Sequence, residues 1–267
     1  MAKRTKPKPA KTAKIKPKVA KAKPTNSKPA IKKKPAPKKA AGKKSPAKPK
    51  PLSKPASQRL LAQVDFAAVA DHYAKRLAVH GHIVDLYRRG KAGPYAVAAL
   101  GMTDPVANYS AWEHDLGSRI FRRASPNRIL DLARTLAALP SAADLPAAVR
   151  AADIDWLKIS AASEMAAMLD PARFWVTNIR TVWAHRLVQQ NWNAAKANEE
   201  LKLYRDYERD AAMEYTMWSG LHQEVGPSLL TLSAKSEPFA RKRGEHAYMW
   251  GDAIADWLYT HRDQLKP

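Results

Sequence analysis

The sequence predicts an all-α domain preceded by a disordered polycationic tail. Apolar residues beyond the tail recur at helical spacings, and no alternating run of β-branched residues reaches the length of a strand. Glycine is scarce, with 10 residues in a chain of 267. We expect residues 1–57 to form the tail and residues 58–267 to form one irregular bundle of about seven to nine helices with short connections.

The tail is a low-complexity segment of lysine, proline and alanine. It holds 21 of the 47 Lys and Arg residues and none of the 24 Asp and Glu residues, because the first acid is Asp65. Its eleven prolines remove helical hydrogen bonds, and it has almost no apolar residues to bury. We therefore expect an extended, disordered segment that its own charge keeps open. The rest of the chain is nearly neutral.

The composition of the tail indicates a binder of polyanions. Each lysine that meets a phosphate releases a condensed counterion, and with Arg4 as the tail's single arginine we expect phosphate contact without base readout. The tail resembles the lysine-, alanine- and proline-rich tails of linker-histone-like chromatin and bacterial nucleoid proteins, which implies DNA as the partner. A scaffold whose tail binds an anionic membrane or an acidic polymer is an alternative. The residues expected to contact phosphate are Lys3, Arg4, Lys6, Lys8, Lys11, Lys14, Lys16, Lys18, Lys32, Lys33, Lys34, Lys38, Lys39, Lys43, Lys44, Lys48 and Lys50.

The helices beyond the tail are delimited by caps and by glycine and proline. We expect Gly81 to break or kink the first long helix, Asp104-Pro105 to open a helix in the middle of the chain, and Gly226-Pro227 to end one. The expected helices are approximately 66–89, 95–100, 104–123, 125–140, 153–169, 170–193, 198–218 and 238–259.

The two helices between residues 153 and 193 are expected to form the centre of the core, with Asp170-Pro171 starting the second of them. Glu164 falls on an otherwise apolar helix surface, so its carboxylate should enter the interior and find a partner in Arg173, Arg180 or His185. We interpret this region as a structural buried pair rather than a catalytic site. The polar cluster expected around it comprises Glu164, Asn178, Arg180, Thr181 and His185.

His114-Asp115, with His80 and His82 upstream, suggests a second interpretation. These residues resemble the His…His-Asp…Asp signature of the all-helical HD-type metal phosphohydrolases, and the resemblance implies that His82, His114 and Asp115 would bind a divalent metal that activates water. The sequence departs from that pattern at Ser118, where a basic residue often follows the glycine. It also shows no later aspartate that identifies itself as the fourth ligand.

Several classes of protein are excluded by what the sequence lacks. The absence of cysteine excludes a disulfide framework, a cysteine-based zinc site and a thiol nucleophile. No apolar run is long enough to span a bilayer, no secretory signal is present, and no motif indicates a cofactor. We therefore expect a cytoplasmic protein, associated with the nucleoid in a bacterium or located in the nucleus of a eukaryote. It would bind nucleic acid through the tail, and the helical domain would mediate self-association or a protein contact.

Overall fold

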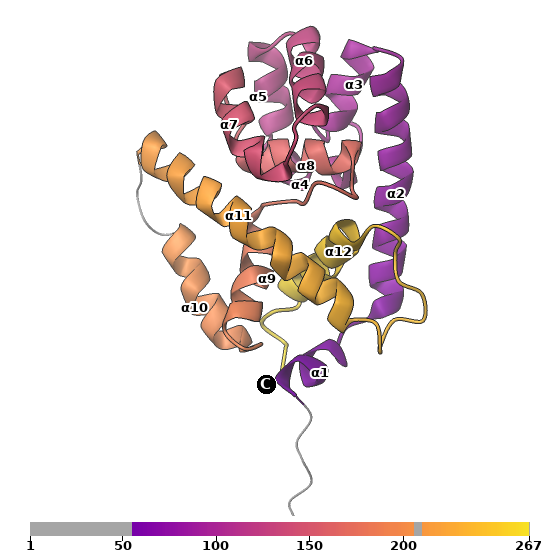
Figure 1. Ribbon diagram of the computed structural model, residues 1–267, viewed down its shortest axis with the longest axis vertical. Coiled ribbons are helices and arrows are strands. Elements are labelled where there is room, and N and C mark those ends of the chain that lie inside the picture. Colours follow the sequence, from indigo (N-terminus) through magenta and orange to yellow (C-terminus); the bar gives the residue numbers. More distant parts are fainter. Residues whose placement is uncertain (1–54, 206–209, 267) are drawn as a thin grey trace, which may run out of the picture. The chain divides into compact units, whose positions relative to one another are not determined.

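A computed structural model describes residues 55–205 and 210–266, and every regular element in these ranges is helical (Figure 1). This confirms the all-α prediction for the described chain, but the number of helices is larger than expected. The described residues form twelve α-helices and two short 3-10 helices. The α-helices are α1 (Ala56–Leu61), α2 (Phe66–Arg88), α3 (Ala92–Ala99), α4 (Tyr109–Glu113), α5 (Leu116–Arg123), α6 (Pro126–Ala137), α7 (Leu145–Ala152), α8 (Ile159–Leu169), α9 (Ile179–Gln189), α10 (Ala194–Arg205), α11 (Ala211–Lys235) and α12 (Ala247–Thr260). The 3-10 helices are η1 (Pro105–Ala107) and η2 (Ala142–Asp144).

The long helix α2 runs along one side of the domain and connects its two halves (Figure 1). Helices α3 to α8 gather at one end and α9 to α12 at the other, and α8 also packs on α11. The diagonal helix α11 packs on α9 and α12. Near α1, the side chain of Gln63 donates to the carbonyl of Lys266 (2.9 Å) and accepts from the Lys266 N–H (3.0 Å). These two hydrogen bonds hold the C-terminal segment against the end of α1.

Polar caps determine where several helices begin. The Asp65 carboxylate accepts from the N–H groups of Ala67 and Ala68 and starts α2. At α9 the Asn178 side chain caps the first turn, while the Thr181 hydroxyl accepts from the Asn178 N–H. Such reciprocal capping satisfies N–H groups at both ends of the motif and fixes the start of α9.

Three predicted helices have different boundaries in the structure. Helix α2 is continuous through Gly81, where open space surrounds the glycine and nothing forces a kink. The helix expected over 104–123 is three separate elements, because the Asn108 side chain caps α4 and the chain turns again at Asp115 with φ +49°. Likewise, the helix expected over 198–218 is α10 and α11, and Asp210 caps the latter.

The prediction that Asp170-Pro171 starts a helix is also wrong. Asp170 is the C-cap of α8, and the chain is not helical again until Ile179. Tertiary hydrogen bonds replace helical ones in between: the Thr177 N–H donates to the Ser163 hydroxyl (2.9 Å), and the Trp175 indole donates to the carbonyl of His222 (2.8 Å). The sequence signal for a cap was present, but the core holds this segment in another conformation.

Gly226-Pro227 does not end a helix, because both residues lie inside α11. Pro227 is exposed, and α11 continues past it because its other face is packed on α9 and α12. Gly226 is needed for packing rather than for a turn, since a Cβ there would lie 2.8 Å from the ring of Trp175. Close packing of α11 on its neighbours therefore overrides the local preference of the Gly-Pro pair.

The contact between α11 and α12 gives a test of this packing. A Cβ on Gly251 of α12 would lie 2.3 Å from the carbonyl oxygen of Leu229, so Gly251→Ala must push the two helices apart. We expect a loss of about 2–3 kcal/mol in the free energy of unfolding, despite the better helix propensity of alanine. Gly220→Ala is the matched control, because Gly220 lies in α11 with nothing within 4 Å, and should gain about 0.5–1 kcal/mol. Urea unfolding of both variants measures the difference, and equal midpoints would contradict the close approach of α11 and α12 at Gly251.

Candidate functional site

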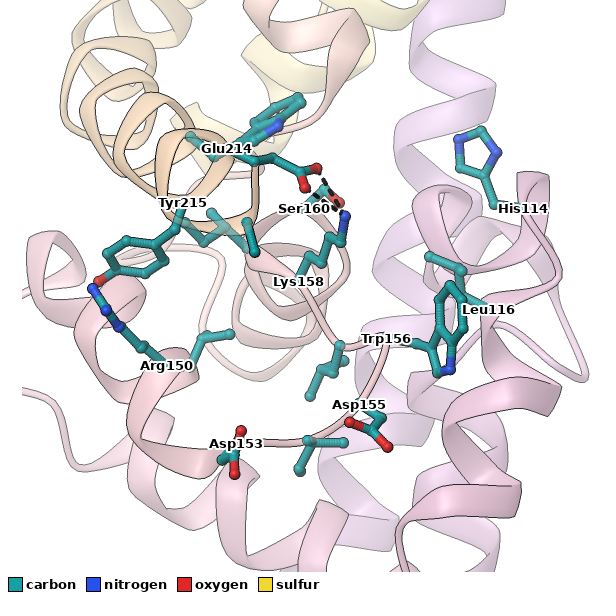
Figure 2. A pocket seen from close by; sticks show the side chains of 16 residues that line it. His114, Leu116, Arg150, Asp153, Asp155, Trp156, Lys158, Ser160, Glu214 and Tyr215 are labelled. Carbon is teal, nitrogen blue, oxygen red and sulfur yellow. Dashed lines mark hydrogen bonds and ion pairs between the residues drawn. The ribbon is translucent and has the colours of Figure 1, made fainter. Parts of the chain in front are cut away.

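An open hollow of 620 Å³ lies beside the loop that joins α7 to α8 (Figure 2). Figure 2 shows Lys158, Ser160 and Glu214 on one side, Tyr215 and Arg150 on a second, and Trp156 with Leu116 on a third. Buried apolar residues form much of the remaining wall: Val149, Ile154, Leu157 and Ile159. This volume lies within the usual range for pockets that bind small ligands.

Trp156 is the most unusual residue of the pocket. Its φ is +68°, a left-handed conformation that is uncommon for a bulky side chain and costs about 1–3 kcal/mol. Ile154 and Leu157 are buried on either side and anchor the loop, while Trp156 itself is 48 % exposed. The Arg119 guanidinium lies 5.3 Å from the centre of its ring. The loop therefore presents an indole to the pocket instead of burying it.

Charged groups around the pocket are partly paired. The Lys158 ammonium lies 2.8 Å from both carboxylate oxygens of Glu214 and joins the loop to α11. The Arg150 guanidinium lies 4.6 Å from the centre of the Tyr215 ring. Such contacts with partly exposed groups contribute little to stability, but they fix the side chains of the wall.

Several polar groups of this pocket are either far apart or paired with one another. Ser160 and His114 both line it, but they lie on different sides, and no hydrogen bond between them exists among the described residues (Figure 2). A serine nucleophile needs a base within hydrogen-bond reach. Lys158 and Glu214 neutralise each other, so neither is an obvious acid or base. The pocket offers aromatic and apolar surface with a charged rim.

The Glu164 carboxylate is completely buried, but its partners are not the cations that the sequence suggested. It accepts from the N–H of Tyr109 (2.6 Å), from the N–H and hydroxyl of Ser110 (3.1 and 2.6 Å), and from the Asn178 side chain (3.1 Å). Asn108, the residue before Tyr109, donates its side-chain N–H groups to the carbonyls of Ala99 and Ala161. Glu164 therefore links the start of α4 to the cap of α9 through neutral donors.

The predicted polar cluster is thus only partly assembled. Asn178 contacts Glu164, and Thr181 joins through the cap of α9, but Arg180 and His185 bind elsewhere. Arg180 pairs with Glu113 and Asp256. Burial acts to lower the pKa of Arg180, yet the two carboxylates outweigh it and raise that pKa.

His185 lies one turn after Thr181 in α9 and contacts α11 instead of Glu164. Its Nδ1 is 2.9 Å from the hydroxyl of Ser228, and its Nε2 is 3.2 Å from a carboxylate oxygen of Glu224. Burial lowers the pKa of His185, and the neighbouring Arg186 acts in the same direction. Arg173, the third candidate partner of Glu164, instead donates to the carbonyls of Ala137 and Leu139.

A buried ion pair between Arg76 and Asp252 was missed by the sequence reasoning. The two side chains are 2 % and 5 % exposed, and the Arg76 Nη1 lies 3.0 Å from the Asp252 Oδ2. Burial raises the pKa of Asp252 to about 6, although Arg76 opposes the shift. A signal was present, because Arg76 follows Val69 and Tyr73 at helical spacing on the buried face of α2.

The candidate metal ligands do not form a site. His82 is exposed on α2, His114 is the C-cap of α4, and Asp115 is exposed at the start of α5. Within residues 55–205 and 210–266, no three His, Asp or Glu side chains are arranged to hold a metal ion. The geometry therefore gives no support to the HD-type ligand set.

The tail residues Lys3 to Lys50, which were expected to contact phosphate, lie outside the described residues. None of the helices from α1 to α12 has an apolar stretch of the length that spans a bilayer. No known protein family, curated protein or solved structure matches the chain in comparisons of sequence and fold.

Proposed function

We propose that the chain associates with nucleic acid, without marked sequence preference, through its lysine-rich tail. The observation that carries the proposal is the charge distribution: 21 basic residues and no acid precede the helical domain, and the remaining 26 basic and 24 acidic residues nearly cancel. Charge of this density attracts the phosphate backbone and releases its counterions. DNA is the expected partner, in the nucleoid of a bacterium or the nucleus of a eukaryote.

In this proposal the helical domain supplies self-association or a protein contact. The pocket around Trp156 supports that role, since a partly exposed indole in a fixed loop beside apolar residues is typical of protein contacts. We prefer binding over an enzymatic role because Ser160 and His114 lie on different sides of the pocket and Lys158 pairs with Glu214. No cofactor enters the proposal.

The proposal is tested by changing the chemistry of the tail while keeping its length. Replacing every tail lysine by arginine should preserve binding to duplex DNA, whereas replacing every tail lysine by glutamine should abolish it, because positive charge is the proposed cause. Fluorescence anisotropy with a labelled duplex of random sequence measures both affinities. Strong binding by the glutamine variant would refute the proposal. A large loss in the arginine variant would mean that the tail acts by something other than charge.

A further inference from the structure

A second pocket, of 420 Å³, lies where α2 meets the end of α8 and the start of α12. From α2 it is lined by His80, Val84, Tyr87 and Arg88. The segment after α8 contributes Asp170, Pro171 and Arg173, and His246 comes from the N-cap of α12. It is separate from the pocket of Figure 2, and the two share no lining residue.

Positive charge dominates this pocket. Asp170 is its single acid, and the Arg173 Nε donates to that carboxylate at 3.1 Å. Because Arg173 neutralises Asp170, the guanidinium of Arg88 is an uncompensated positive charge. Arg88 lines the pocket, is exposed and has no ion pair among the described residues, unlike the adjacent Arg89, which pairs with Asp85 at 2.8 Å.

The two imidazoles add hydrogen-bonding capacity. His80 Nδ1 is 2.8 Å from the carbonyl oxygen of Met168. A carbonyl can only accept, so Nδ1 carries the proton and donates it, and Nε2 is the nitrogen left for a ligand. The ring of His246 lies 6.1 Å from that of His80, centre to centre. Tyr87 is among the residues that line the same pocket.

The charge balance favours an anion over a metal ion. Two imidazoles would suit a transition metal, but the one carboxylate nearby is engaged by Arg173, and the guanidinium of Arg88 would repel a divalent cation. Arginine together with imidazole and hydroxyl donors is instead the combination that holds phosphoryl oxygens.

We propose that this pocket binds a phosphoryl group, with Arg88, His80 and His246 as the groups that contact it. The pocket is larger than a phosphate ion, and Val84, Leu169 and Pro171 give it apolar wall, so a small organic part of a phosphorylated ligand fits beside the phosphoryl group. The inference does not depend on the tail, since every contributing residue belongs to the helical domain.

The experiment measures the rate at which diethyl pyrocarbonate modifies individual histidines in the full chain, resolved by peptide fragmentation in a mass spectrometer. Inorganic phosphate and pyrophosphate should slow modification of His80 and His246 when chloride keeps the ionic strength constant. His82 is the internal control, because it is exposed on the same helix and outside the pocket. Its rate should not change.

Arg88→Gln and Arg89→Gln are the matched variants, because they remove the same charge from neighbouring surface positions. Arg88→Gln loses a charge-assisted hydrogen bond to the phosphate. The phosphate concentration that halves the modification rate of His80 and His246 should therefore rise about tenfold in this variant. In Arg89→Gln it should stay the same. Equal protection of His82, equal behaviour of the two variants, or no protection at all would each overturn the proposal.

A short thymidine oligonucleotide, added in place of phosphate, identifies the source of the phosphoryl group. If the site takes backbone phosphodiesters, the oligonucleotide protects His80 and His246 in an Arg88-dependent manner. If it takes free phosphate or monoesters, only phosphate and pyrophosphate do so. Failure of all three probes, with DNA binding by the tail intact, would overturn this inference and leave the proposed function standing.

Discussion

Affinity of the full chain for duplex DNA is expected to fall by about 10³–10⁵ between roughly 50 and 200 mM salt. The 21 basic residues of the tail cannot all engage at once, because eleven prolines and the charge repulsion of the chain prevent continuous tracking of one groove. Engagement of about 6–10 phosphates gives a slope of about −5 to −9 in a plot of log affinity against log salt. Duplex RNA should behave similarly, because the contact is to the backbone.

The control for this titration is the fragment 55–267. It begins one residue before α1, so it keeps every described helix and loses all the basic residues of the tail. Its circular dichroism should show the helical content of the domain, while its affinity for DNA should nearly disappear. A fragment that binds as tightly as the full chain, with the same slope, would move the binding site to the helical domain.

Titrations of the full chain and of the fragment also distinguish DNA binding by the tail from binding by the pocket of His80, Arg88 and His246. The pocket offers one principal uncompensated cation, Arg88, so by itself it should give a slope near −1 at most. A shallow salt dependence of DNA affinity in the fragment would therefore be due to the pocket if Arg88→Gln abolishes it. A steep salt dependence in the full chain would be due to the tail. Neither measurement can substitute for the other.

Helical periodicity predicted the class of fold and several helices, because burial of apolar faces depends on spacing that can be read from the chain. The boundaries were less predictable where tertiary contacts decide them. Asp170-Pro171 has the chemistry of a helix start, yet the bonds of Thr177 and Trp175 to distant partners keep the following segment non-helical. Pro227 has the chemistry of a stop, yet α11 continues because its packed face outweighs one missing hydrogen bond.

The same limit applies to the polar groups. The sequence placed Glu164 on an apolar surface, and this side chain is indeed buried. Its donors on Tyr109 and Ser110 lie more than fifty residues away, and nothing in the local pattern identifies them. The exposure of Trp156 could not be predicted from the sequence either, because it follows from a left-handed backbone conformation that the folded loop imposes.

Glu164→Ala is expected to lower the free energy of unfolding by about 4 kcal/mol. The substitution removes the acceptor from four donors, namely two backbone N–H groups, the Ser110 hydroxyl and the Asn178 amide, in a place that water does not reach. Each buried donor left without a partner costs about 1–3 kcal/mol, and relaxation around the new cavity recovers part of the total. The loss should weaken the start of α4 and the cap of α9 together.

Glu164→Gln separates hydrogen bonding from charge. One oxygen of the carboxylate accepts from Ser110 and Asn178, and a glutamine carbonyl can keep those bonds. The other oxygen accepts from the Tyr109 N–H, which a glutamine NH₂ group would oppose with a second donor. We therefore expect Glu164→Gln to cost about half as much as Glu164→Ala. Urea unfolding followed by circular dichroism gives both values, with Glu199→Ala on the exposed face of α10 as a control that should change stability by less than about 0.5 kcal/mol. If both Glu164 variants unfold at the midpoint of the parent chain, the carboxylate is solvated and does not link α4 to α9.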